Sequence, residues 1–247
     1  KKAGRIAAEG ICRIAVKDEG TAAVVEVNSE TDFVANTDEF KNFVNLVADT
    51  IIEKNPADVE ALKATVVSGG TATVDEALQE LFLKIRENLQ IRRFVRLEGT
   101  LMPYIHGGGK IGVMVRVESS DGASEAALTV AKDCALQIAA MNPAYLNREA
   151  VPASVLEEEK TIVLSQMAED PKMAAKPEQV RAKIAEGKVG KYFSENCLLE
   201  QAFVKENKET VQSYVDGVAK AAGTTIAITD FVRFERGEGI EKKQENF

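Results

Sequence analysis

Acid–base chemistry at neutral pH would depend in this chain on a single histidine or on carboxylates shifted by burial. The chain contains one histidine, His106, and three cysteines, Cys12, Cys134 and Cys197, which lie far apart and lack the paired spacing of metal ligands. This distribution is more typical of reduced thiols that pack in the interior than of a disulfide framework, although their odd number leaves an intermolecular bridge open. We therefore predict no catalytic residue, no metal site and no cofactor.

A glycine-rich run follows the histidine. Gly107-Gly108-Gly109-Lys110 superficially resembles a phosphate-binding loop, but it lacks the spacing of such a loop and the Ser or Thr after the lysine. It also leads into a strand instead of a helix, and glycine readily adopts the positive φ angles that tight hairpin turns need. We interpret the run as a hairpin turn and His106 as a hydrogen-bonded loop residue.

The segment Thr31-Asp32-Phe33-Val34 has two interpretations, a binding site and ordinary packing, and the residues alone favour packing. It follows a β-branched strand with an acidic and an aromatic residue that the local periodicity does not require. A phenylalanine presented on a turn can fill a pocket on a partner, and Asp32 can bond at its edge. The structural alternative makes Ser29 the N-cap of a short helical turn, with Asp32 at the capping-box position and Phe33 and Val34 in the core.

The elements around this segment are an antiparallel hairpin and several helices. Residues 11–16 and 22–28 are rich in β-branched side chains, and the turn-forming cluster Asp18-Glu19-Gly20 lies between them. A weaker helix is predicted around residues 56–63, and a strand over residues 91–98. Two amphipathic helices show apolar residues at helical spacing: Phe40, Phe43, Val44, Val47 and Ile51 in the first, and Leu78, Leu81, Phe82, Ile85 and Leu89 in the second.

The order of elements then repeats. Residues 109–117 form a period-two strand that mirrors residues 20–27 at an offset of 90, and residues 231–235 echo residues 94–98 at an offset of 137. The difference of 47 residues indicates that the second copy carries an insertion. A helix again follows the strand, with these apolar positions on one face: Ala127, Ala131, Cys134 and Ile138.

The insertion has the pattern of two helices that return on each other. Asp170-Pro171 and Lys176-Pro177 mark a break between two apolar stripes, so the helices are predicted to pack antiparallel and to project from the module. A strand near residues 199–204, a helix and a strand over residues 225–235 complete the second copy. The apolar positions that define these helices are Val155, Leu156, Ile162, Val163, Met167, Val180, Ile184 and Phe193 in the insertion, and Val211, Val215, Val218 and Ala222 after it.

We therefore predict an α+β fold of two similar subdomains, each with a small antiparallel sheet and packed helices, plus an inserted projecting helical hairpin. The first subdomain is expected over residues 1–100. The second is expected over residues 101–152 and 198–247, and it is interrupted by a coiled-coil hairpin over residues 153–197.

Composition limits the class of protein. The 247 residues are 45% hydrophobic and carry a formal net charge of -8. No apolar run is long enough to cross a bilayer and the first residues lack the apolar core of a secretory signal, so we expect a soluble protein of the cytoplasm or of an organelle interior, the chloroplast stroma or mitochondrial matrix. The acidic balance argues against direct nucleic-acid binding, which depends on clustered Lys and Arg, and favours a protein partner.

Residues 26–35, Glu-Val-Asn-Ser-Glu-Thr-Asp-Phe-Val-Ala, closely resemble the signature of the elongation factor Ts family. The resemblance covers nearly the whole chain and implies a core of two related subdomains with a protruding coiled-coil hairpin. It also implies that the chain lacks most of the family's N-terminal domain and its C-terminal helix. The other segments that look like family landmarks are residues 1–4, 88–93, 106–107, 231–234 and 237–241.

The resemblance implies a function that composition cannot supply. In this family the Thr-Asp-Phe-Val segment reaches the GTPase elongation factor Tu and helps to dislodge its nucleotide-bound magnesium ion. This makes Thr31, Asp32, Phe33 and Val34 the partner-binding residues. Gln137 stands where some members have a partner-contacting histidine, so it is a candidate secondary contact; the alternative is a packed helix with Gln137 in solvent.

We therefore predict a guanine-nucleotide exchange factor that acts on elongation factor Tu during translation elongation and is not an enzyme. The alternative is a noncatalytic scaffold or assembly protein that oligomerises through the helical hairpin, with Phe33 in its core. A homodimer is left open. The exposure of Phe33 in the folded chain discriminates between the two functions.

Overall fold

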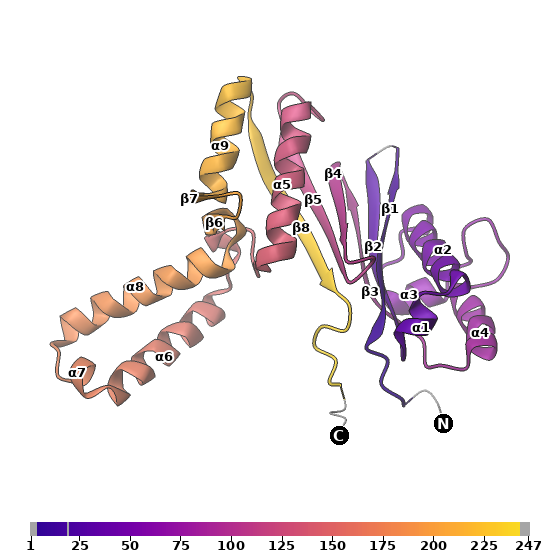
Figure 1. Cartoon of the computed structure of the whole chain (residues 1–247), viewed down its shortest axis with the longest axis horizontal. Coiled ribbons are helices and arrows are strands. Elements are labelled where there is room, and N and C mark those ends of the chain that lie inside the picture. Colours follow the sequence, from indigo (N-terminus) through magenta and orange to yellow (C-terminus); the bar gives the residue numbers. More distant parts are fainter. Residues whose placement is uncertain (1–3, 19, 243–247) are drawn as a thin grey trace. The chain divides into compact units, whose positions relative to one another are not determined.

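A computed structural model describes residues 4–18 and 20–242 (Figure 1). These residues form a mixed α and β protein with small sheets and packed helices, which confirms the predicted fold class. The chain divides into two compact units, one made of residues 1–139 and 227–247 and the other of residues 140–226.

The first sheet belongs to the first unit and has the strand order β1-β2-β3. β1 (Glu9–Lys17) and β2 (Thr21–Ser29) form the predicted antiparallel hairpin, and β3 (Gln90–Glu98) pairs antiparallel with β2. Glu19 of the predicted turn lies outside the described residues, as do residues 1–3 of the landmark segment at the start of the chain.

Helices cover one face of this sheet (Figure 1). Ala23, Val25 and Val27 alternate along β2 and pack into the same core as the apolar stripes of these helices, as strand and helix periodicity require. Thr37 caps the longest of them, because its Oγ1 accepts a hydrogen bond from Phe40 N at 3.3 Å. The helices are α1 (Asp32–Ala35), α2 (Asp38–Lys54), α3 (Val59–Lys63) and α4 (Val74–Ile85).

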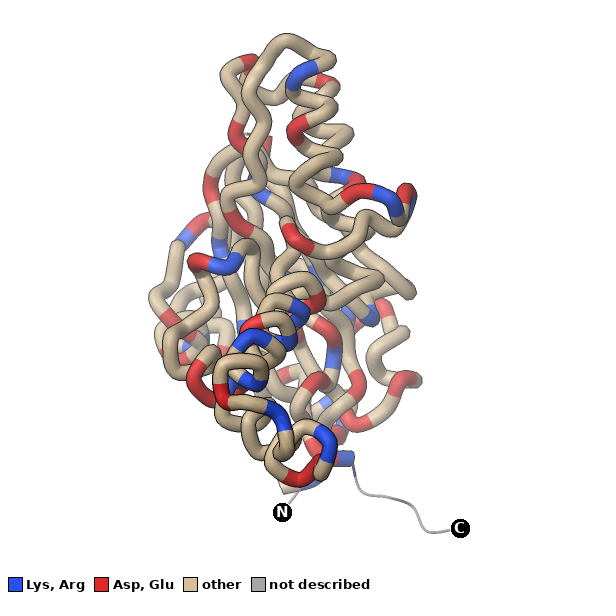
Figure 2. The backbone as a smooth tube through the Cα atoms, turned by 90° about the vertical axis from the view of Figure 1, so that its left-hand side faces the viewer, with Lys and Arg blue, Asp and Glu red and all other residues tan. Residues whose placement is uncertain are grey.

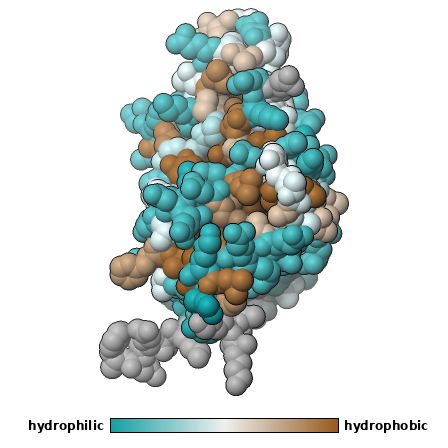
Figure 3. All heavy atoms as spheres, turned by 90° about the vertical axis from the view of Figure 1, so that its right-hand side faces the viewer, coloured by the Kyte–Doolittle hydropathy of each residue, from teal (hydrophilic) through white to brown (hydrophobic). Residues whose placement is uncertain are grey.

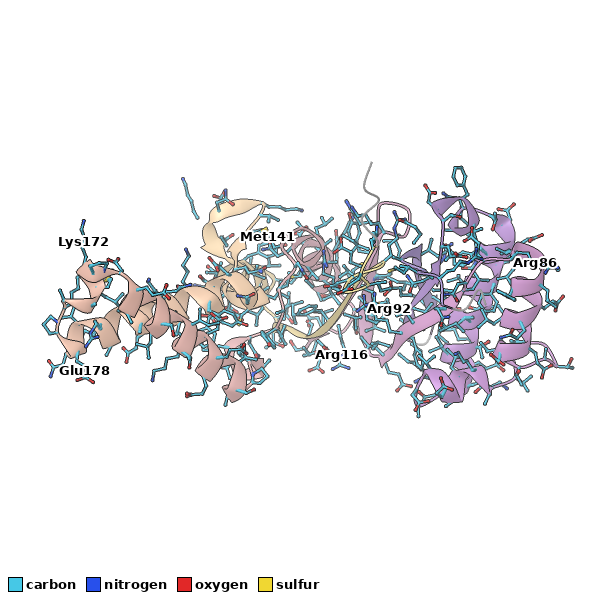
Figure 4. All side chains as sticks on the ribbon, turned by 90° about the horizontal axis from the view of Figure 1, so that it is seen from below. Arg86, Arg92, Arg116, Met141, Lys172 and Glu178 are labelled. Carbon is cyan, nitrogen blue, oxygen red and sulfur yellow. The ribbon has the colours of Figure 1, made fainter. Side chains whose placement is uncertain are left out.

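Helix α4 ends earlier than its apolar stripe predicts. The sequence places Leu89 on the helix, but Arg86, labelled in Figure 4, has a φ of 66° and caps the helix in the left-handed conformation. Leu89 is nevertheless buried in the helix-side core. The apolar spacing therefore predicted correctly that Leu89 is a core residue, but it was wrong to place Leu89 on the helix.

The second sheet also belongs to the first unit and has the order β4-β5-β8. β5 (Ile111–Ser119) and β8 (Ile226–Glu235) correspond to predicted strands, whereas β4 (Thr100–His106) was not predicted. Arg233 of β8 donates a hydrogen bond to Ala139 O at 3.3 Å and so ties the strand to helix α5 (Glu125–Met141).

The two sheets of the first unit pack against each other. Strand β2 is buried on both faces, because the residues that alternate with its helix-facing ones enter a second cluster. This cluster combines Cys12, Ala22 and Val24 of the first sheet with Met114, Val232 and Phe234 of the second.

The second unit contains the predicted helical hairpin. α6 (Ala153–Glu169) and α8 (Glu178–Asn196) run antiparallel and are joined through the short helix α7 (Pro171–Ala174) (Figure 1). Lys172 and Glu178 lie at the end of the hairpin where the chain turns (Figure 4). The side chains buried in the seam are Val163, Met167 and Ala185. Ile162 and Val180, which the sequence placed on the apolar stripes, are exposed, so their prediction as packing positions is wrong.

The rest of the second unit differs from the expectation of one strand near residues 199–204. Residues 198–200 form a 3-10 turn and only Ala202–Phe203 extends as a strand. Phe203 stacks on Tyr214 with ring centroids 4.1 Å apart, which fixes the following helix. The remaining elements are η1 (Arg148–Ala150), η2 (Leu198–Glu200), β6 (Ala202–Phe203), β7 (Glu206–Thr210) and α9 (Val211–Ala222).

Candidate functional site

The predicted binding segment forms the short helix α1. Its N-cap is Thr31, whose Oγ1 accepts a hydrogen bond from Val34 N at 3.3 Å. Ser29 does not cap the helix, because its hydroxyl donates to Thr31 O at 2.8 Å. The expectation that Ser29 is the cap is therefore wrong by two residues.

The four residues of the segment have different surroundings. Phe33 is 83% exposed, so the interpretation that buries it in the core is wrong. Asp32 is also exposed, whereas Val34 is half-buried against the helix-side core and Thr31 is half-buried as the cap. Asp32 and Phe33 are thus the two side chains that this helix presents to solvent.

A glutamate distant in sequence holds the start of α1. Glu87 Oε2 accepts hydrogen bonds from Glu30 N at 3.0 Å and Thr31 N at 3.1 Å, and its Oε1 accepts one from Thr31 Oγ1 at 2.6 Å. In return Glu30 Oε2 accepts a hydrogen bond from Asn88 N at 2.7 Å. Sequence reasoning missed Glu87, because no local pattern links it to Thr31 across 56 positions.

Gln137, the candidate secondary contact, is completely buried on α5. The alternative that placed its side chain in solvent is wrong, since its neighbours on the helix, Cys134 and Ile138, are also fully enclosed. A contact between Gln137 and a partner requires this side chain to leave its packed position. The role of Gln137 in partner binding stays a prediction, and the burial of its side chain does not favour that role.

The glycine run forms the turn between β4 and β5, as predicted. Gly107, Gly108 and Gly109 all have positive φ angles, of 59°, 63° and 112°. Gly109 O also accepts a hydrogen bond from Cys12 N at 2.8 Å, so the turn rests against β1. His106 lies at the end of β4, where its Nδ1 is 2.9 Å from the Tyr104 hydroxyl.

The three cysteines are free and buried. Burial raises the pKa of the Cys12 and Cys134 thiols to about 12, and it also raises the pKa of Cys197. These thiols are protonated at neutral pH, which agrees with their interpretation as packing residues. Across residues 4–18 and 20–242 we find neither a cluster of metal-ligating side chains nor a helix with the length and apolar character of a membrane span.

A fully buried carboxylate, Glu26 on β2, organises a charged cluster beneath the end of β8. Its Oε1 lies 2.7 Å from Arg93 Nε and 3.3 Å from Arg92 Nη1, and its Oε2 accepts hydrogen bonds from Asn28 Nδ2 at 3.0 Å and Gly237 N at 2.7 Å. A β-bulge between Glu26 and Val27 lets both arginines of β3 approach the same carboxylate (Arg92 is labelled in Figure 4). This cluster attaches the chain after β8 to the first sheet.

The surfaces of the two units carry mixed charge. Acidic and basic residues are interspersed along the helical hairpin (Figure 2), and the face that carries the helices of the first unit is mainly hydrophilic with separate hydrophobic patches (Figure 3). The hairpin also contains a groove of about 580 Å³ between α6 and α8. Its apolar lining includes Leu156, Leu164, Val189 and Phe193.

These features define an α+β protein of two packed sheets with an inserted helical hairpin, and an aromatic side chain presented on a short, externally braced helix. An aromatic side chain presented in this way can anchor the contact with a partner protein. Comparison with known proteins identifies the family. A family model described as Elongation factor TS matches residues 30–238.

Elongation factor Ts of Trichlorobacter lovleyi is 46% identical to this chain, over all of the chain and 81% of that protein's length. The Elongation factor Ts proteins of Clostridium kluyveri and Clostridium perfringens are 44% and 45% identical with the same coverage. The chain belongs to the elongation factor Ts family and so to the translation elongation factors.

Proposed function

We propose that this protein is a guanine-nucleotide exchange factor that binds elongation factor Tu and accelerates the release of GDP. The observation that carries the proposal is the 83% exposure of Phe33 on α1. A large aromatic ring left in water gains nothing for the fold, whereas it gains free energy when a partner's pocket encloses it. Membership of the elongation factor Ts family supports the choice of partner.

The proposed mechanism is a wedge. A GTPase holds its nucleotide through a phosphate loop and a bound magnesium ion, so an aromatic side chain that displaces the residues around them weakens the grip. Phe33 is the wedge, and Asp32 beside it supplies a charge or a hydrogen-bond acceptor at the same edge. Because the two binding events share one coupling free energy, nucleotide must weaken binding of the factor as much as the factor weakens binding of nucleotide.

In this proposal the protein makes and breaks no covalent bond. It speeds nucleotide release and leaves the equilibrium between GDP and GTP unchanged, so it needs no catalytic base. The expected place of action is the cytoplasm or the interior of an organelle, where translating ribosomes lie.

Replacement of Phe33 by alanine tests the proposal. Loss of an aromatic anchor costs about 2 kcal/mol of binding, so Phe33→Ala is expected to lower the exchange efficiency roughly thirtyfold. Stopped-flow release of a fluorescent GDP from elongation factor Tu measures this efficiency, with far-UV circular dichroism as the check on folding.

Val16→Ala is the matched control. Val16 is also an exposed apolar residue of the first unit, 50% exposed, but it lies at the opposite end of the β1–β2 hairpin from α1. This variant should exchange nucleotide at the wild-type rate. Equal rates for Phe33→Ala and wild type would remove the wedge from the mechanism.

A further inference from the structure

Helix α1 is too short to hold its own conformation. Four residues make a single turn, and nucleation of an isolated turn is unfavourable. Only Ala35 of the helix is fully buried, with Val34 half-buried, so packing fixes one side of the turn. Phe33 contributes almost no contact within its own chain, and the direction of its ring depends on the backbone that carries it.

The contacts of Glu87 fix that backbone at the start of the helix. Its carboxylate accepts three hydrogen bonds, from Glu30 N, Thr31 N and Thr31 Oγ1, at 2.6–3.1 Å. The Thr31 hydroxyl can donate to only one acceptor, and this bond leaves its oxygen free to accept from Val34 N. Glu87 therefore orients the hydroxyl of the N-cap residue Thr31, which accepts the hydrogen bond from Val34 N, the residue after Phe33.

A second set of contacts fixes the loop after α4, which carries Glu87. Glu30 receives a hydrogen bond from Asn88 N at 2.7 Å and an ion pair from Arg5 Nε at 2.9 Å. Arg5 also donates to Arg86 O, the carbonyl just before Glu87, at 3.0 Å. The two loops, before α1 and after α4, are thus bonded to each other in both directions.

We propose that Glu87 is a positioning residue for nucleotide exchange: it keeps α1 in the orientation that presents Phe33 to the partner. This inference rests on the proposed exchange function. Loss of the carboxylate removes charge-assisted hydrogen bonds from a single helical turn in which only Ala35 is fully buried, so α1 should open about tenfold more often. The exchange efficiency of Glu87→Ala should fall roughly tenfold. That of the isosteric Glu87→Gln should fall less, because its amide oxygen, in the position of Oε2, can still accept from Glu30 N and Thr31 N.

Two measurements test the role of Glu87 on the full chain. The first is amide hydrogen exchange, in which Glu87→Ala should speed exchange of residues 32–36 while β1, β2 and β3 keep their protection. The second is stopped-flow release of fluorescent GDP from elongation factor Tu for Glu87→Ala, Phe33→Ala and the double variant. If Glu87 acts through the ring, the double variant should be no slower than Phe33→Ala alone.

Glu76→Ala is the control, because Glu76 also accepts a hydrogen bond from an N-cap threonine, here from Thr73 Oγ1 at 3.3 Å, but at the start of α4 instead of α1. It should leave nucleotide release unchanged. The inference is overturned if Glu87→Ala leaves hydrogen exchange of α1 unchanged, or if its effect on release adds fully to that of Phe33→Ala. Absence of any acceleration by the wild-type chain would instead refute the proposed function, and the hydrogen-exchange result would still decide whether Glu87 holds α1.

Discussion

The buried carboxylate of Glu26 gives a sharp prediction about stability. In Glu26→Gln an amide nitrogen replaces one carboxylate oxygen, and each oxygen faces donors: Arg93 Nε at 2.7 Å on one side, Gly237 N at 2.7 Å and Asn28 Nδ2 at 3.0 Å on the other. Either orientation of the amide points a donor at a donor. The loss of one charge-assisted hydrogen bond and the desolvated group left behind should lower the free energy of unfolding by about 2–3 kcal/mol.

The expected loss of unfolding free energy is smaller than for breaking a fully buried ion pair, because water reaches the two arginines. Arg92 and Arg93 are 25% and 30% exposed, so water can replace part of what they lose. Urea-induced unfolding followed by circular dichroism measures the change, and amide hydrogen exchange of β2 reports the first unit directly. Glu238→Gln is the control, because Glu238 is 44% exposed and 3.6 Å from Arg93, and it should change stability by less than about 1 kcal/mol. If Glu26→Gln were no more destabilising than this control, the cluster would not hold the chain after β8.

Two further predictions concern alkaline pH and backbone strain. Because the pKa of Cys134 is raised from 9.0 to about 12, the unfolded chain loses its thiol proton first, so wild type should lose about 1.4 kcal/mol relative to Cys134→Ala between pH 8 and pH 10 in urea titrations. Gly237 has a φ of 73°, and a Cβ there would lie 2.3 Å from Ala8 O. Gly237→Ala should therefore destabilise by more than the about 1–2 kcal/mol expected for Gly122→Ala, which has a similar φ of 63° but no neighbour within 4 Å; equal thermal midpoints would contradict this.

Sequence periodicity predicted the elements that bury a regular face. The β1–β2 hairpin, helices α2 and α4 and the helical hairpin all place apolar residues at the spacing of their secondary structure. Strand β4 was missed because it lies at the edge of its sheet, is only partly buried and contains Pro103. Proline is tolerated at such an edge, but in the sequence it argues against a strand.

The candidate site shows a different limit of sequence reasoning. The segment from Thr31 to Val34 was found, but Ser29 was chosen as its cap because both residues carry a hydroxyl and either spacing fits a capping motif. The choice between them is made by Glu87, which bonds the Thr31 hydroxyl from 56 positions away. A contact of this kind depends on how the two loops meet in three dimensions, so the residues around Thr31 in the sequence cannot predict it.

The division of roles within the segment explains how a short helix can present a large ring. Thr31 and Val34 face inward, one bonded to Glu87 and the other packed on the helix-side core, and they hold the backbone from both ends. Asp32 and Phe33 then need make no contact with their own chain. Leaving Phe33 exposed forgoes about 1.5–3 kcal/mol of burial free energy, which the fold gains elsewhere from the buried faces of α2 and β2. In the proposed function, contact with a partner accounts for an exposed ring on a turn that is braced by bonds to a distant loop.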